Sequence, residues 1–181
     1  MVGGGARLIQ LRDKQASSAR FFREAAECMA YAREHGVRVI INDRVDIARI
    51  VGADGVHLGQ DDLPAQEARR ILGPDSIIGL STHSLAQARE AQRDPVDYIA
   101  IGPVFGTATK SDPDPEVGII GVEAVRSVIG DMILVAIGGI EESNISAVLQ
   151  AGANSAAIIG GILRNPEAIT ERTAKLIQTA V

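Results

Sequence analysis

Short runs of apolar residues recur along the whole chain and alternate with amphipathic stretches. The runs are rich in valine and isoleucine, as buried strands are. They cover residues 8–11, 37–41, 55–58, 77–80, 98–101, 133–137 and 156–159. Helix signals lie between them: Pro64 precedes one amphipathic stretch, Ser84 and Gln87 have the spacing of a capping box, and Asn165-Pro166 precedes the last stretch. This alternation predicts an α/β protein with a parallel sheet, either a closed (β/α)8 barrel or an open doubly wound sheet.

Polar or small residues follow nearly every predicted strand. They are Arg12 and Lys14, Asn42-Asp43, Gly59-Gln60-Asp61-Asp62, Ser81-Thr82-His83, Gly102-Pro103, Gly138-Gly139 and Gly160-Gly161. In a barrel all these strand ends ring one face, where barrel enzymes place their chemistry, whereas an open sheet concentrates ligand contacts at one switch point. The pattern therefore favours a TIM (β/α)8 barrel forming a single domain over residues 1–181, although seven strands are predicted and the fold needs eight.

The first predicted strand ends in an unusual polar pattern. Gln10, Arg12 and Lys14 occupy alternate positions, so an extended chain directs all three side chains to one side. Burying an amide and two cations without partners is costly, and buried parallel strands are normally apolar on both faces. One interpretation is an anionic ligand opposite them. The other is a strand that ends at Gln10, with Arg12 and Lys14 as solvated loop residues.

Carboxylates follow the next two strands. Asp43 ends one strand and Asp61-Asp62 follows its neighbour, so two carboxylates can meet across strands spaced roughly 5 Å apart. Two carboxylates that leave positions open for phosphate oxygens and water are typical of a Mg²⁺ site. The alternative is that these aspartates cap the helices that follow.

Two further segments suit phosphate groups. The connection after Gly102 contains Thr107, Thr109 and Lys110 and returns to a helical pattern only near residue 121, which fits either an anion-binding lid or an exposed polar loop. Residues 112–115 in it are interpreted as a spacer. The paired glycines at 138–139 and 160–161 let backbone N–H groups approach a phosphate, and they also suit ordinary tight turns. His57 and His83, beside strand ends, are interpreted as structural.

Composition and charge limit the classes of molecule that the protein is expected to bind. The net charge is −5, aromatic residues make up 3% of the chain, and the sequence has no run of Lys and Arg, which argues against nucleic acid or a membrane as the main partner. Cys28 is the sole cysteine, so neither a disulfide framework nor a cysteine metal cluster is expected. Without a signal-peptide pattern or an apolar run near ~18 residues, a cytoplasmic protein is predicted, with its oligomeric state open.

Taken together, the motifs resemble those of the thiamine-phosphate synthase family. They are Gln-Leu-Arg-Asp-Lys at 10–14, Ile-Asn-Asp at 41–43, Gly-Val-His-Leu-Gly-Gln-Asp-Asp at 55–62, Gly-Leu-Ser-Thr-His at 79–83, Gly-Pro-Val-Phe-x-Thr-x-Thr-Lys at 102–110 and Ala-Ile-Gly-Gly-Ile at 136–140. The resemblance implies a TIM barrel that condenses hydroxymethylpyrimidine diphosphate with a thiazole phosphate, giving thiamine phosphate and diphosphate with the help of Mg²⁺.

The resemblance also implies roles for individual residues. Asp43 and Asp62 would bind Mg²⁺. The residues expected to bind the pyrimidine diphosphate are Gln10, Leu11, Arg12, Asp13, Lys14, Asn42, Ser81 and Lys110, of which Arg12, Lys14, Ser81 and Lys110 would be catalytic. The residues expected around the thiazole phosphate are Thr107, Ala108, Thr109, Gly139, Ile159 and Gly160.

The chain departs from the family pattern at three places. Gly106 and Ala108 stand where the family usually has prolines, and Gly160 stands where a serine is expected. The family's first strand and helix have no counterpart, so the natural protein is expected to begin roughly 25–35 residues earlier, the length of one more βα unit. The alternatives are a thiazole tautomerase-like isomerase, or a truncated non-catalytic remnant that binds phosphates.

Overall fold

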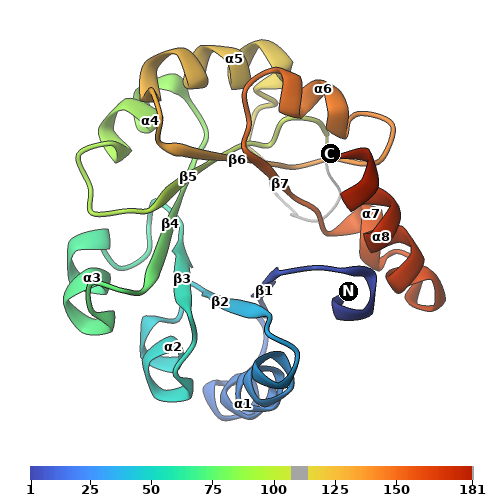
Figure 1. Cartoon of the computed structure of the whole chain (residues 1–181). Coiled ribbons are helices and arrows are strands. Elements are labelled where there is room, and N and C mark those ends of the chain that lie inside the picture. Colours follow the sequence, from blue (N-terminus) through green and yellow to red (C-terminus); the bar gives the residue numbers. More distant parts are fainter. Residues whose placement is uncertain (107–113, 181) are drawn as a thin grey trace.

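A computed structural model describes residues 1–106 and 114–180 and shows one sheet of seven parallel strands (Figure 1). The strands are β1 (Leu8–Leu11), β2 (Arg38–Asn42), β3 (Gly55–Leu58), β4 (Ile77–Thr82), β5 (Tyr98–Ile101), β6 (Ile133–Ile137) and β7 (Ser155–Ala157). Their spatial order follows the sequence, and every neighbouring pair is parallel. The predicted alternation of strands and helices is confirmed.

The sheet curls, and helices cover its outer face (Figure 1). The helical segments in the described residues are η1 (Val2–Gly4), which packs against α8, α1 (Ser18–Glu34), α2 (Val45–Val51), α3 (Ala65–Leu72), α4 (Leu85–Ala91), α5 (Gly118–Ile129), α6 (Ile145–Gln150), α7 (Gly160–Leu163), η2 (Pro166–Ala168) and α8 (Ile169–Thr179). The predicted start of α4 is confirmed because the Ser84 hydroxyl accepts a hydrogen bond from the Gln87 N–H at 3.2 Å. No helix in the described ranges is both long and apolar enough to cross a membrane.

Three strands have other boundaries than those predicted. β2 extends to Asn42, which pairs with His57, and β4 extends through Ser81 to Thr82. These polar residues remain in the ladder because Asn42 and Ser81 face a polar cavity inside the curl, described below. β7 is shorter than predicted and ends at Ala157, so Ile159 lies outside the sheet as the residue preceding α7.

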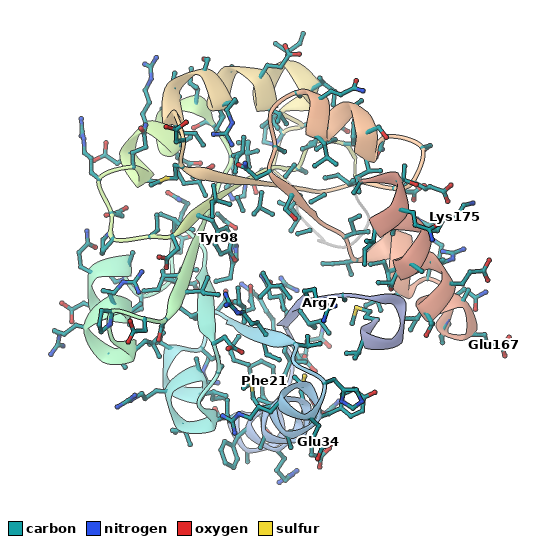
Figure 2. The ribbon with its side chains drawn as sticks, in the orientation of Figure 1. Arg7, Phe21, Glu34, Tyr98, Glu167 and Lys175 are labelled. Carbon is teal, nitrogen blue, oxygen red and sulfur yellow. The ribbon has the colours of Figure 1, made fainter. Side chains whose placement is uncertain are left out.

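Side chains along each strand point alternately outward and inward, so apolar residues form one layer under the helices and another inside the curl. The outward side chains of β2, such as Val39 and Ile41, pack with Phe21 of α1 in one cluster between sheet and helices. A smaller cluster inside the curl contains Ile40 and Tyr98, and Figure 2 shows Tyr98 on the inner side of the sheet. The inner face of the sheet therefore bears the residues that can reach a ligand.

The two ends of the sheet remain apart in the described chain. β1 pairs with β2 and β7 pairs with β6, and no pairing between β1 and β7 is observed in the described residues. Leu8 at the start of β1 and Ile133 at the start of β6 are 51% and 50% exposed. The TIM-like α/β architecture is thus a curled seven-stranded sheet. The expected βα unit before β1 stays a prediction.

Candidate active site

A cavity of about 880 Å³ opens at the carboxyl ends of the strands. All seven strands contribute to it, either with their last residues or with the residues that follow them. From β1 to β7 these include Gln10, Asn42, His57, Ser81, Gly102, Ile137 and Ala157. Active sites of TIM-barrel enzymes lie at this same face of the sheet. The cavity is therefore the candidate active site.

Most of the predicted site residues lie at this cavity. The lining includes Gln10, Arg12, Lys14, Asn42, Asp43, Asp62, Ser81, Gly139, Ile159 and Gly160. Thr107, Ala108, Thr109 and Lys110 lie outside the described residues. Their predicted roles are therefore not tested by the structure.

β1 ends at Leu11, so Arg12 and Lys14 are exposed loop residues, close to the second of the two interpretations. Gln10, Arg12 and Lys14 all line the cavity, whereas Leu11 packs against the apolar cluster under α1. Asp13 is likewise not brought to the cavity. Its carboxylate accepts hydrogen bonds from the backbone N–H groups of Gln15 and Ala16 at 2.9 and 3.0 Å, and these bonds lower the pKa of Asp13.

The two predicted metal-binding carboxylates, Asp43 and Asp62, lie next to each other. Asp62 accepts a 2.6 Å hydrogen bond from the Gly59 N–H. The pKa of Asp62 is raised, first by burial and then by hydrogen bonding to the Asp43 carboxylate and by its charge. Lys14 Nζ lies 2.9 Å from Asp43 Oδ2. These contacts neutralise the negative charge of Asp43 and Asp62 only in part, so the two carboxylates still attract a cation.

Neither aspartate acts as the helix cap considered as an alternative. The residue preceding α2 is Arg44 and the residue preceding α3 is Pro64, and neither helix has a side-chain cap. Asp43 instead has a left-handed backbone, with φ of 61°, and its N–H donates to the His57 carbonyl at 2.9 Å. Such a conformation is uncommon for a residue with a side chain and is concentrated at functional sites.

The carboxylate pair fits Mg²⁺. The described residues contain no group of three or more His, Cys, Asp or Glu side chains that could hold a metal. Mg²⁺ is commonly bound through one or two carboxylates, with water and substrate phosphates completing the octahedron. Asp43 and Asp62 could supply that protein share.

A buried hydrogen-bonded group crosses the inner face of the sheet. His57 Nδ1 lies 2.8 Å from the Tyr98 hydroxyl and His57 Nε2 lies 2.8 Å from the Ser81 hydroxyl. Gly79 makes this possible, because a side chain at that position would overlap the Tyr98 ring. Burial raises the pKa of Tyr98, so its phenol stays protonated at neutral pH. His57 therefore fixes the Ser81 hydroxyl at the cavity, a positioning role that the sequence interpretation missed.

Other cavity residues were also missed. The Gln60 amide donates to the Ser81 carbonyl at 2.6 Å, and His83 Nδ1 lies 2.6 Å from the Gly102 carbonyl and 3.4 Å from Asp114 Oδ2. Asp114 falls in the segment interpreted as a spacer, yet it lines the cavity. The polarity of the residues after each strand was the only sequence signal for these contacts.

The two glycine pairs differ in whether a side chain would fit at their positions. A Cβ at Gly138 or Gly139 would lie 2.6–2.7 Å from Pro103 or Phe105, and both glycines have positive φ. Close packing therefore requires glycine there. Gly160 has no such constraint, because a Cβ would meet no heavy atom nearer than Arg164 Nη2, at 3.8 Å. The wall is accordingly open at Gly160.

Comparisons with known proteins identify the family of the chain. Residues 1–162 match the family model for thiamine monophosphate synthase. The thiamine-phosphate synthase of Azorhizobium caulinodans is 46% identical over 97% of this chain and 83% of its own, and that of Chloroflexus aurantiacus is 43% identical over 90% and 74%. A thiamine phosphate pyrophosphorylase structure from Pyrococcus furiosus has a TM-score of 0.89 and 33% identity, covering 99% of this chain and 85% of that one. The chain therefore belongs to the thiamine monophosphate synthase family and is a transferase of the thiamine-phosphate synthase type.

Proposed function

We propose that the cavity binds hydroxymethylpyrimidine diphosphate and a thiazole phosphate together and joins them to give thiamine phosphate and diphosphate. The observation that carries this proposal is the distribution of groups around one cavity. Arg12, Lys14, Asp43 and Asp62 gather at the ends of β1 to β3, and a wall rich in glycine follows β6 and β7. The first group suits a metal-bound diphosphate and the second suits a monophosphate approached by backbone N–H groups.

Asp43 and Asp62 would hold Mg²⁺. When bound, Mg²⁺ supplies positive charge to the oxygens of the departing diphosphate. Arg12 and Lys14 act in the same direction, because they line the cavity beside the carboxylates and can donate charged hydrogen bonds to the leaving group. Lys110 is assigned the same role on the resemblance alone.

The proposed reaction needs no protein nucleophile. The bond between the pyrimidine methylene carbon and the diphosphate oxygen breaks, and its electron pair leaves with diphosphate. The thiazole nitrogen then forms the new C–N bond with its lone pair. The protein orients the two small molecules: Gln10, Asn42 and the Ser81 hydroxyl hold the pyrimidine substrate, while Gly139, Ile159 and Gly160 hold the thiazole phosphate.

A product assay with components omitted in turn tests the proposal. Purified protein is incubated with both substrates and Mg²⁺, and thiamine phosphate and diphosphate are measured. We expect the two products in equal amounts, and none when either substrate or the metal is omitted. Isomerisation of a thiazole precursor without diphosphate release would support a tautomerase and refute the proposal, as would the absence of thiamine phosphate from the complete mixture.

A further inference from the structure

An ion pair joins the loops that follow β6 and β7. Arg164, directly after α7, places Nη2 at 3.0 Å from Oε1 of Glu141, which lies beyond the glycine turn after β6. Both residues line the large cavity, although their side chains are 69% and 46% exposed. The pair therefore reaches the cavity from its rim.

Positive charge is unevenly placed around the cavity. Arg12 and Lys14 lie with the carboxylates at the β1 end of the sheet. The wall after β6 and β7 is lined by glycine and apolar residues, and its charged members among the described residues are Glu141 and Arg164. Two phosphorylated substrates bring negative charge to two places in the cavity. Within the described part of the chain, Arg164 is the cation at the second place.

The space beside Arg164 is open. Gly160 is not in the left-handed region, and a Cβ there would meet nothing nearer than the Arg164 guanidinium at 3.8 Å. Packing therefore does not require glycine at this position, in contrast to Gly138 and Gly139. The missing side chain leaves room for an anion between the first residue of α7 and the guanidinium.

The ion pair between Arg164 and Glu141 is weak enough for a phosphate to replace the Glu141 carboxylate. Exposed ion pairs are weak, because water and salt screen them. A phosphate dianion offers a guanidinium more charge than a carboxylate does and accepts two parallel hydrogen bonds from its fork. We propose that Arg164 leaves Glu141 to bind the phosphate of the thiazole substrate. The inference rests on the proposed function and supplies the cation at its monophosphate end.

Calorimetric titration separates the phosphate contact from the rest of the ligand. The dissociation constants of the thiazole phosphate and of the matching thiazole alcohol are measured for the wild type and for Arg164→Ala. We expect the variant to bind the phosphate roughly 10- to 100-fold more weakly, as the loss of a charged hydrogen bond does, and to bind the alcohol unchanged. Arg164→Lys should restore part of the affinity, and Glu141→Gln should tighten phosphate binding because it removes the competing carboxylate.

Lys175→Ala is the matched control. Lys175 forms a similarly exposed ion pair with Glu142 at 2.9 Å, lies on α8 (Figure 2) and does not line the large cavity. Removing this cation should leave both dissociation constants unchanged. An equal loss in Lys175→Ala would show a general effect of surface charge and overturn the inference.

The outcomes also separate this inference from the proposed function. Unchanged phosphate binding in Arg164→Ala, or an equal loss for phosphate and alcohol, overturns the role of Arg164 even if the wild type makes thiamine phosphate. A wild-type protein that makes no thiamine phosphate refutes the proposed function, while the titration still decides whether Arg164 binds the phosphate. A wild type that binds the phosphate no more tightly than the alcohol overturns the inference directly.

Discussion

Replacing Asp62 with asparagine should abolish most activity and leave the fold almost unchanged. The Asp62 carboxylate accepts the 2.6 Å hydrogen bond from the Gly59 N–H, and an amide oxygen can accept the same bond. The substitution removes one of two adjacent negative charges, whose crowding raises the pKa of Asp62 together with burial. Relief of that repulsion offsets the loss of a stronger, charged hydrogen bond. The proposed metal site, in contrast, loses one of its two carboxylates.

The expected losses of activity and stability follow from these contacts. Turnover should fall at least ~100-fold, as it does when one group that stabilises developing charge is removed, and the Mg²⁺ concentration for half-maximal rate should rise. Asp62→Ala also removes the acceptor for the Gly59 N–H and should cost about 1–2 kcal/mol, a fall in Tm of roughly 2–8 °C for a chain of this length. Asp62→Asn should change Tm by less than about 2 °C.

Steady-state kinetics over a Mg²⁺ series and thermal unfolding measure the two effects separately. Asp75→Asn is the control, because it removes an exposed carboxylate that does not line the cavity, and it should retain turnover. Full activity of Asp62→Asn, or full wild-type activity in excess chelator, would refute the metal-binding role. A large fall in Tm for Asp62→Asn would instead show that the carboxylate serves mainly to stabilise the fold.

Three further substitutions test other parts of the account. Arg12→Ala should raise the KM of the pyrimidine diphosphate or slow its ionisation without raising the KM of the thiazole phosphate, and an equal effect on both substrates in steady-state kinetics would contradict this. Gly79→Ala should displace the Tyr98 ring and cost at least ~1–3 kcal/mol, measured by denaturant unfolding; an unchanged midpoint would show that the inner face repacks freely. Ser84→Ala should cost about 1 kcal/mol by removing the bond to the Gln87 N–H, with no change in the KM of either substrate.

The sequence was sufficient for the order of strands and for much of the site, because both follow from local periodicity. Gln10 reaches the cavity from β1, and Arg12 and Lys14 reach it from the loop that follows this strand. Asp43 and Asp62 meet because parallel strands that are neighbours in sequence are also neighbours in this sheet. Asn42 and Ser81 both line the cavity, although their strands extend further than the apolar runs indicated.

The missed contacts depend on register and on space, which local patterns do not encode. His57 meets Tyr98, 41 positions away, only because His57 pairs with Gly79 and Gly79 in turn pairs with Tyr98. Asp13 lies within a motif that implied ligand binding, but its carboxylate is occupied by the turn that follows β1. The pairing of Glu141 with Arg164 likewise needs two loops to be brought together in three dimensions.

A crystal structure with Mn²⁺, diphosphate and thiamine phosphate bound would locate the metal and both phosphate positions, because Mn²⁺ replaces Mg²⁺ and gives an anomalous signal. We expect one metal peak shared by the Asp43 and Asp62 carboxylates, with diphosphate against Arg12 and Lys14. We also expect the phosphate of thiamine phosphate beside Gly160. A metal bound away from both carboxylates, or diphosphate bound at the glycine wall, would refute the proposed arrangement of the site.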